Sequence, residues 1–297
     1  MPRLMRGTLL LAFAAFLWRD GSAAPDPRLA AAIPAIESTI KKSGADVAVA
    51  FRTLDGRTQW LRRPDEPFHA ASTMKVAVLI ELYRQARQGK LKLDDPLSVK
   101  NEFHSLVDGS AFALDPNDDS ERTLYRAGGG TRTLRELSEL MITVSSNLAA
   151  NLLMDRLGVE NIRAGVRALG ADGMNVLRDL EDAKAFEQGL VNTTTAQALL
   201  TLLEAIARGQ AVDRESSRQM LETLERQTIN DGIPAGLPAG TRVAHKTGDI
   251  TRIWHDAGIV LARRPFVLVV LTRGLENPKE STALIAEITR ELYRATQ

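Results

Sequence analysis

The 297-residue chain carries 38 Lys and Arg against 37 Asp and Glu, and hydrophobic residues make up 44% of it. This is the composition of an ordinary globular protein, long enough for one large domain or two interleaved ones. The balanced charge offers no basic surface for nucleic acid. The absence of cysteine excludes disulfides, a thiolate nucleophile and a thiolate-bound metal.

Residues 1–24 have the pattern of a secretory signal peptide. Arg3 and Arg6 precede the apolar run 9–17, and the small residues 22–24 follow it. A basic start, an apolar run and a small-residue stop are typical of an export signal, and this run is well short of the ~20 residues that cross a bilayer. We therefore expect a periplasmic or secreted bacterial protein with its catalytic domain at 25–297 and no other membrane segment. A retained N-terminal anchor is the alternative.

Helix and strand patterns alternate along the rest of the chain. Apolar residues at helical spacing predict a helix over 28–43. Two short apolar runs, 47–51 and 58–61, flank Asp55-Gly56 as the arms of a hairpin. The remaining predicted elements are, in order, an apolar helix from near Ser72 to about Gln88, a surface insertion at 115–130, helices within 133–220 broken at Gly158, Gly170 and Gly209, a long ordered loop at 178–192, strands at 242–245, 257–261 and 266–271, and a helix at 278–295.

This order predicts an α+β fold. Strands from both ends of the chain form one antiparallel sheet with flanking helices, and the helical block is inserted as an all-helical lobe. We expect the sheet-containing lobe at about 25–70 and 235–297, and the helical lobe at about 71–234. A catalytic cleft would lie between the lobes, where pockets commonly form.

Ser72 and Lys75 lie three residues apart at the predicted start of the apolar helix. Residues at this spacing share one helix face, so the lysine amine can reach the serine hydroxyl. A serine becomes a nucleophile when a neighbouring base takes its proton. A lysine acts as that base when burial and nearby positive charge depress its pKa. The alternative is a helix-capping serine beside a solvated lysine.

Two later segments carry side chains suited to the same site. Ser145-Ser146-Asn147, at a turn in the helical block, offers a hydroxyl and an amide. Lys246-Thr247-Gly248, at the end of a predicted strand, offers a charge, a hydroxyl and a glycine along an edge against which an extended substrate can lie. Taken singly, these residues are explained by helix capping and surface charge. In this order and at these separations they favour one catalytic site.

The three segments together resemble the signature of the class A β-lactamases and related penicillin-recognising serine enzymes, which is Ser-x-x-Lys, Ser-Asp-Asn and Lys-Thr-Gly in that order. The resemblance covers roughly residues 28–295, and the Ser-Ser-Asn variant resembles class A-related serine hydrolases of unassigned substrate still more. It implies an antiparallel sheet with an inserted helical lobe. It also implies an acyl-enzyme at Ser72, with Lys75 as its proton partner and Ser145 as a proton relay. Asn147 would bind a substrate amide, and Lys246 and Thr247, beside Gly248, would bind the substrate carboxylate. The backbone N–H groups of Ser72 and Asp249 would form the oxyanion hole.

The resemblance further implies a glutamate in the long loop that activates the deacylating water. Glu181 is the preferred residue, because a carboxylate near a lysine and a nucleophile can hold and deprotonate a water molecule. Strict counting of the family's spacing selects Asp179 instead. A structural ion-pair cluster with Arg178 or Lys184 is the third interpretation.

Three positions depart from the family's pattern or are variable in it. Ser146 stands where an aspartate is usual, and Asp249 stands where a serine or threonine follows Lys-Thr-Gly. A carboxylate at Asp249 would repel an anionic β-lactam unless it pairs with Arg252 or Lys246. His104 occupies a position that the family often fills with an aromatic residue, and a plain surface position is the alternative.

The leading functional prediction is β-lactam hydrolysis through an acyl-enzyme at Ser72. The alternatives are a DD-peptidase-like or esterase hydrolase acting on a cell-wall peptide or another amide or ester, and a non-catalytic penicillin-fold binding protein. We expect a monomer with a small-molecule substrate, no nucleic-acid partner, no metal and no cofactor. The histidines lack the spacing of a metal site, and His255 is expected to pack at a strand end; they are His69, His104, His245 and His255.

Overall fold

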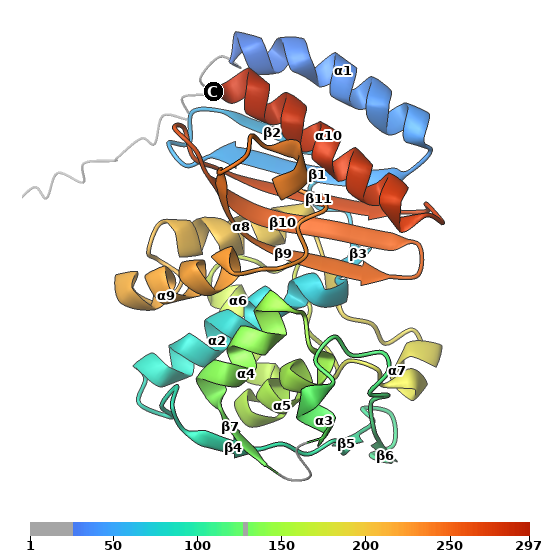
Figure 1. The fold of residues 1–297 in the computed structure, drawn as a ribbon, viewed down its shortest axis with the longest axis vertical. Coiled ribbons are helices and arrows are strands. Elements are labelled where there is room, and N and C mark those ends of the chain that lie inside the picture. Colours follow the sequence, from blue (N-terminus) through green and yellow to red (C-terminus); the bar gives the residue numbers. More distant parts are fainter. Residues whose placement is uncertain (1–25, 127–129) are drawn as a thin grey trace, which may run out of the picture.

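The computed structural model describes residues 26–126 and 130–297, and the predicted signal peptide lies outside them. One five-stranded sheet has the order β2-β1-β11-β10-β9, and its printed pairings are all antiparallel. Strands from the two ends of the chain therefore lie side by side (Figure 1), and the predicted α+β fold is confirmed. The strands are β1 (Asp46–Thr53), β2 (Gln59–Arg62), β9 (Arg242–Ile250), β10 (Ile253–Leu261) and β11 (Phe266–Arg273).

Helices cover both faces of this sheet (Figure 1). Two long helices, α1 (Pro27–Ser43) and α10 (Pro278–Thr296), lie on the outer face. On the inner face α8 (Ala196–Ala207) contacts β1, β10 and β11. The longer helices of the other lobe are α2 (Lys75–Arg87), α4 (Leu134–Thr143), α5 (Asn147–Leu157), α6 (Val159–Ala168) and α9 (Arg214–Glu225).

Short elements connect these layers. The short helices are η1 (Ala71–Met74), α3 (Thr123–Arg126), α7 (Ala183–Glu187) and η2 (Pro234–Gly236). Three two-stranded ribbons pair β3 (Phe68–His69) with β8 (Thr193–Thr194), β4 (Pro96–Ser98) with β7 (Thr131–Thr133), and β5 (Phe103–His104) with β6 (Ala111–Phe112). Among the described residues, no helix is both long and apolar enough to cross a membrane.

Alternate residues of β1 enter different cores. Val47, Val49 and Phe51 pack with α1 and α10 on the outer face. Ala48 and Ala50 belong to the core shared with the helical lobe. Successive side chains of a strand point to opposite faces, and a strand covered on both faces has an unbroken apolar run. This double coverage makes the sheet a rigid base for the residues at its β9 edge.

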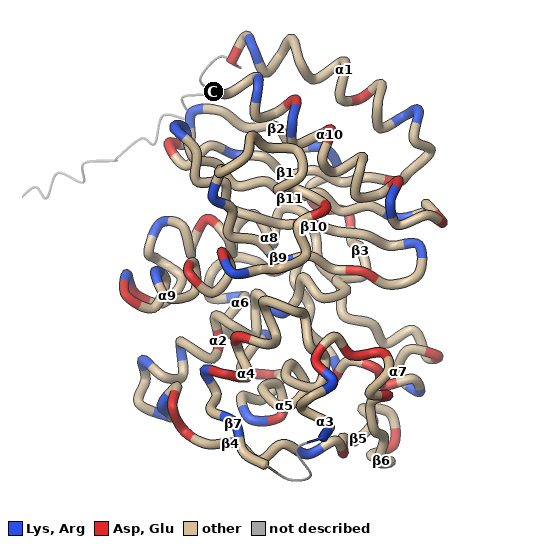
Figure 2. Tube along the Cα trace, viewed as in Figure 1, with Lys and Arg blue, Asp and Glu red and all other residues tan. Residues whose placement is uncertain are grey.

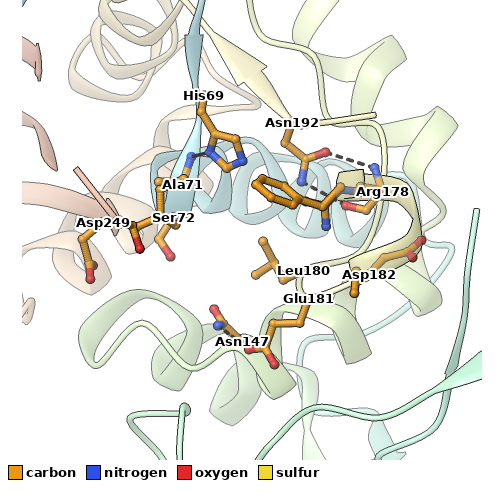
Figure 3. Close-up of a pocket in the computed structure, with 14 residues that line it drawn as sticks. His69, Ala71, Ser72, Asn147, Arg178, Leu180, Glu181, Asp182, Asn192 and Asp249 are labelled. Carbon is orange, nitrogen blue, oxygen red and sulfur yellow. Dashed lines mark hydrogen bonds between the residues drawn. The ribbon is translucent and has the colours of Figure 1, made fainter. Parts of the chain in front are cut away.

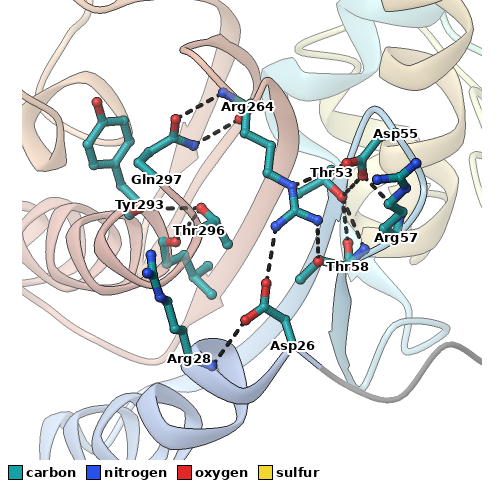
Figure 4. Close-up of polar contacts among 11 residues, drawn as sticks. Asp26, Arg28, Thr53, Asp55, Arg57, Thr58, Arg264, Tyr293, Thr296 and Gln297 are labelled. Atoms are coloured by element: carbon teal, nitrogen blue, oxygen red, sulfur yellow. Dashed lines mark hydrogen bonds and ion pairs between the residues drawn. The ribbon is translucent and has the colours of Figure 1, made fainter.

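Arg264 ties three distant parts of the outer layer together (Figure 4). Its guanidinium pairs with Asp26 at the start of α1 and with Asp55 in the β1–β2 turn, at 3.1 and 3.2 Å. It also donates to Thr58 Oγ1 at 2.6 Å. Its backbone N–H donates to Gln297 Oε1 at 3.0 Å. These contacts hold the start of α1, the β1–β2 turn and Gln297 against one sheet.

The predicted helix breaks at three glycines are confirmed. Gly158, Gly170 and Gly209 have φ angles of 83, 75 and 72°, in the left-handed region that favours glycine. The long ordered loop predicted at 178–192 is present, and it includes one short helix. This loop contains α7, because the Asp182 side chain caps that helix by accepting from the N–H of Ala185 at 3.1 Å.

Four sequence predictions need correction. The helix expected from Ser72 begins as the tight turn η1. The strand expected to stop at His245 runs on as β9 to Ile250, because it stays paired with β10 as far as Ile250 opposite Ile253. The predicted surface insertion at 115–130 contributes a buried carboxylate, Asp119, which is only 4% exposed. His255 packs as expected, fully buried near the start of a strand, but that strand, β10, begins at Ile253, earlier than the predicted strand at 257–261.

Core packing can be tested with two phenylalanines of contrasting burial. Phe266 is fully buried with its ring 5.1 Å from that of Phe51, while Phe186 is 55% exposed. We expect Phe266→Ala to lower the free energy of unfolding by about 3–5 kcal/mol, because it leaves a cavity under the outer helices. Phe186→Ala should cost less than about 1 kcal/mol. Chemical denaturation measures both, and equal losses would contradict the packing described.

Candidate active site

The edge strand β9 passes Ser72 at a distance that requires glycine. A Cβ atom on Gly248 would lie 3.0 Å from the backbone nitrogens of both Ser72 and Thr73. Any other residue would push η1 and β9 apart, because such contacts are shorter than carbon and nitrogen normally allow. Gly248 therefore brings the start of the helical lobe against the edge of the sheet.

Lys75 is buried with its amine among four polar groups. Its Nζ lies 3.0 Å from Ser72 Oγ, 2.7 Å from the Ser145 carbonyl oxygen, 2.8 Å from Asn147 Oδ1 and 3.2 Å from Ser145 Oγ. Burial, and after it the nearby positive charge of Lys246, hold the pKa of Lys75 well below its usual range. A neutral amine has a lone pair that can accept the proton of Ser72. The geometry thus places an amine of lowered pKa beside a serine hydroxyl.

Ser145 joins the two buried lysines. Its hydroxyl accepts from Lys246 Nζ at 2.9 Å and from Lys75 Nζ at 3.2 Å. Burial lowers the pKa of Lys246 to about 7, although the charge of Asp249 opposes this shift. The backbone of Ser145 is left-handed, with φ of 64°, a strained conformation for a residue other than glycine. A hydroxyl can donate and accept at once, so Ser145 offers a path for a proton between the two amines.

A cavity of about 400 Å³ opens over Ser72, and Glu181 lines it from the opposite side. Figure 3 shows Ser72 and Asp249 on one side, and Asn147 and Glu181 together on another. Asn147 Nδ2 donates to Glu181 Oε1 at 2.8 Å, while its Oδ1 accepts from Lys75. The amide thus links the loop carboxylate to the buried amine next to Ser72.

Glu181 and Asp179 lie on different sides of their loop. Glu181 lines the cavity that contains Ser72, and Asp179 lines a separate cavity with His104 and Asp155. Partial burial raises the pKa of the Glu181 carboxyl. Burial and the neighbouring charge of Asp155 raise the pKa of Asp179 to about 7. Of the two carboxyls, only Glu181 is placed to act on a group bound to Ser72.

The structure does not support an ion-pair cluster of Glu181 with Arg178 or Lys184, because both basic side chains bind other groups. Arg178 donates to the backbone carbonyls of Leu190 and Asp179. Lys184 pairs with Asp108 at 2.7 Å. His104, at the position that the family often fills with an aromatic residue, is exposed and lines the second cavity.

Strand β9 lines the cavity with an exposed carboxylate, and it carries a buried hydroxyl two residues before it. Asp249 is exposed, and Arg252, one of its two candidate partners, pairs with Glu276 at 3.1 Å. Thr247 Oγ1 is buried without a hydrogen-bond partner among the described residues. Buried hydroxyls are nearly always bonded, so Thr247 is suited to bind a substrate group beside Lys246.

Sequence reasoning missed several side chains that position the catalytic segments. Asn151 on α5 binds both the N–H and the carbonyl of Leu180, at 2.8 and 2.9 Å, directly before Glu181. His69 Nδ1 accepts from the N–H of Ala71 at 3.0 Å, directly before Ser72. An asparagine within the apolar run 148–153 was the one local signal for Asn151. No cluster of three or more metal-binding side chains occurs in the described parts of the chain.

Comparison with known proteins places the chain in a family. It matches the β-lactamase enzyme family over residues 28–296. It is 33% identical to the β-lactamase AST-1 of Nocardia asteroides over 289 residues, which is 92% of this chain and 84% of that protein. It is 29% identical to a β-lactamase of Bacillus licheniformis over 245 residues, covering 78% and 73% of the two chains.

Solved structures agree with the sequence comparison. A β-lactamase from Sphaerobacter thermophilus superposes with a TM-score of 0.75 at 26% identity, covering 92% of this chain and 98% of its own. A mutant of PBP-A, solved as an acyl-enzyme complex with penicillin G, gives a TM-score of 0.77 at 26% identity, with coverage of 92% and 98%. The chain belongs to the β-lactamase enzyme family, among the relatives of the class A β-lactamases.

Proposed function

We propose that the protein hydrolyses the amide of a β-lactam through an acyl-enzyme at Ser72. The observation that carries the proposal is the buried Lys75 amine, whose pKa is depressed and which lies 3.0 Å from the hydroxyl of Ser72, a residue that lines the cavity. The acyl-enzyme that the PBP-A mutant forms with penicillin G supports the substrate class, because that protein shares the fold.

Acylation needs one proton transfer in each direction. Ser72 Oγ attacks the carbonyl carbon while its proton passes to neutral Lys75 Nζ. The negative oxygen that forms would be held by the backbone N–H groups of Ser72 and Asp249. When the carbon–nitrogen bond breaks, Lys75 returns the proton through Ser145 Oγ, 3.2 Å from its amine, to the leaving nitrogen. Atoms and charge then balance in a neutral acyl ester.

Deacylation uses the carboxylate on the other side of the cavity. Glu181 would take a proton from a water molecule as that water attacks the ester carbonyl. When the ester bond breaks, this proton passes to the leaving Ser72 Oγ, which restores the serine hydroxyl and the Glu181 carboxylate. Asn147, bonded to Glu181 at 2.8 Å, holds the carboxylate and also faces the substrate. Partial burial raises the pKa of Glu181 and so makes its carboxylate a stronger base.

Lys246 and Thr247 would bind the substrate carboxylate, the first by charge and the second by its unpartnered hydroxyl. Asp249, exposed at the same edge, disfavours substrates of high negative charge. This observation favours a second candidate function, the hydrolysis of a less anionic amide or ester, such as a D-alanyl cell-wall peptide. The pattern of residues 1–24 supports action in the periplasm or outside the cell.

Intact mass spectrometry with penicillin G tests the proposed function. The wild-type protein should gain the mass of the ligand or consume the drug, and Ser72→Ala should do neither, because it lacks the attacking oxygen. Thr73→Ala, at a neighbouring hydroxyl bound to the Ala70 carbonyl at 2.6 Å, serves as the matched control. A wild-type protein that neither gains mass nor consumes penicillin G would contradict the β-lactam substrate.

Replacement of each loop carboxyl separates the two candidate bases. Glu181→Gln should accumulate a stable acyl-enzyme, with deacylation slowed by about 10²–10⁴-fold, since general-base catalysis contributes that much. Asp179→Asn should deacylate within threefold of the wild-type rate, because Asp179 faces the second cavity. Stopped-flow and quenched mass measurements give both rates. Trapping in Asp179→Asn alone would reverse the assignment.

The charge of Lys246 predicts a pH dependence that differs between substrates. Because burial lowers its pKa to about 7, Lys246 is charged below that pH and becomes neutral above it. For an anionic penicillin, kcat/KM should fall as pH rises past 7, since this ratio reports the free enzyme. For an uncharged ester of the same acyl group the fall should be absent. Parallel profiles for both substrates would show that Lys246 does not bind the carboxylate.

A further inference from the structure

A buried carboxylate from outside the three signature segments contacts one of them. Asp119 lies between β6 and α3, in a segment rich in acidic residues, and is 4% exposed. Figure 2 shows acidic positions gathered where this part of the chain meets the loop before α7. Such a group must be well bonded to remain buried, because an unpaired buried charge is costly.

Asp119 is bonded on both oxygens. Its Oδ2 accepts from the backbone N–H of Leu148 at 2.8 Å, from Ser146 Oγ at 3.2 Å and from the Tyr125 hydroxyl at 2.9 Å. Its Oδ1 accepts from the N–H of Glu121 at 2.9 Å. Two of these four donors belong to the first turn of α5 or to its capping residue.

We propose that Asp119 is a positioning residue that replaces, from another part of the chain, the aspartate missing from the middle of Ser145-Ser146-Asn147. Its carboxylate holds Ser145 and Asn147 in place against Lys75. The inference rests on the proposed function, because it assigns the residue a part in the acylation of Ser72.

The capping of α5 is divided between two side chains. The hydroxyl of Ser146 accepts from the N–H of Ala149 at 3.2 Å and donates its own proton to Asp119. Asp119 accepts the neighbouring N–H, that of Leu148. A single aspartate at the capping position can accept one of these N–H groups and place a negative charge at the helix N-terminus. Here the serine supplies the acceptor, and Asp119 supplies the charge and a second acceptor.

Asp119 anchors Ser146 and Leu148, the two residues on either side of Asn147. Asn147 lies between Ser146 and Leu148, and its Oδ1 receives a hydrogen bond from Lys75. Ser145 precedes Ser146 with its strained φ of 64°. A strained backbone persists only where its surroundings over-determine it. Without Asp119 the segment would lose two of its fixed points at the residues that place the proton relay.

Asp119 also acts through its charge. Burial and Lys246 lower the pKa of Lys75, while Asp119, Asp249 and Glu181 oppose that shift. Loss of the Asp119 charge should therefore lower the pKa of Lys75 further and move the acid limb of acylation to lower pH. A residue that only stabilised the fold would not move this limb.

The test compares Asp119→Asn with Asp119→Asn/Ser146→Asp, using acylation rates for penicillin G and for a p-nitrophenyl ester. Asp119→Asn should acylate about 10- to 100-fold more slowly, because misplaced catalytic groups cost this much, with KM within threefold and the acid limb at lower pH. The double variant, which returns a carboxylate to the signature position, should recover to within threefold of wild type. Tyr125→Phe, which keeps the carboxylate, is the matched control and should also stay within threefold.

The inference would be overturned if Asp119→Asn were acylated at the wild-type rate. It would also be overturned if the folded double variant were acylated no faster than Asp119→Asn. If Asp119→Asn does not fold, the double variant decides alone: wild-type acylation supports the inference, and loss of folding or of acylation overturns it. If wild type is acylated by neither substrate, the proposed function has failed separately. Crystal structures of Asp119→Asn then decide: displacement of Ser145 and Asn147 from Lys75 supports the positioning role, and unchanged distances overturn it.

Discussion

Two lysine amines share one serine hydroxyl in the interior of this protein. Lys75 and Lys246 both donate to Ser145 Oγ, at 3.2 and 2.9 Å, and neither side chain is exposed. Two positive charges held this close repel each other, and each also loses its hydration by being buried. The pKa of both amines is accordingly lowered. In the proposed function, this shift is what allows Lys75 to take the proton of Ser72.

The packing of the helical lobe against the sheet brings these two amines together. Helix α2 carries Lys75, and the edge strand β9 carries Lys246 on a sheet whose two faces are both covered. Gly248 removes the side chain that would hold the two elements apart. Strain then collects around the cavity: Ala71, Ser145 and Glu181 all have left-handed backbones, with φ of 46, 64 and 65°. Strained residues of this kind cluster at functional sites, where the surrounding framework holds them.

Much of the fold and part of the site could be predicted from sequence because their signals are local. Periodicity indicated the outer helices and the sheet strands, and glycines marked the helix ends. The long-range contacts carry no such signal. Asp119 reaches Ser146 across 27 positions of sequence, from a segment whose polar composition indicated only a surface loop. The side of the loop on which Glu181 and Asp179 lie depends on single backbone angles, so spacing alone left that choice open.

The most direct test of this account is the titration of the two lysines in the folded, ligand-free protein. NMR of the protein with ¹³C-labelled lysine side chains follows each amine, and Lys75→Arg and Lys246→Arg assign the two signals. The account predicts that Lys246 titrates near pH 7 and that Lys75 titrates far below the ordinary lysine pKa of about 10.4. Two signals that both titrate near 10.4 would contradict it, because Lys75 would then be charged and unable to accept the proton of Ser72.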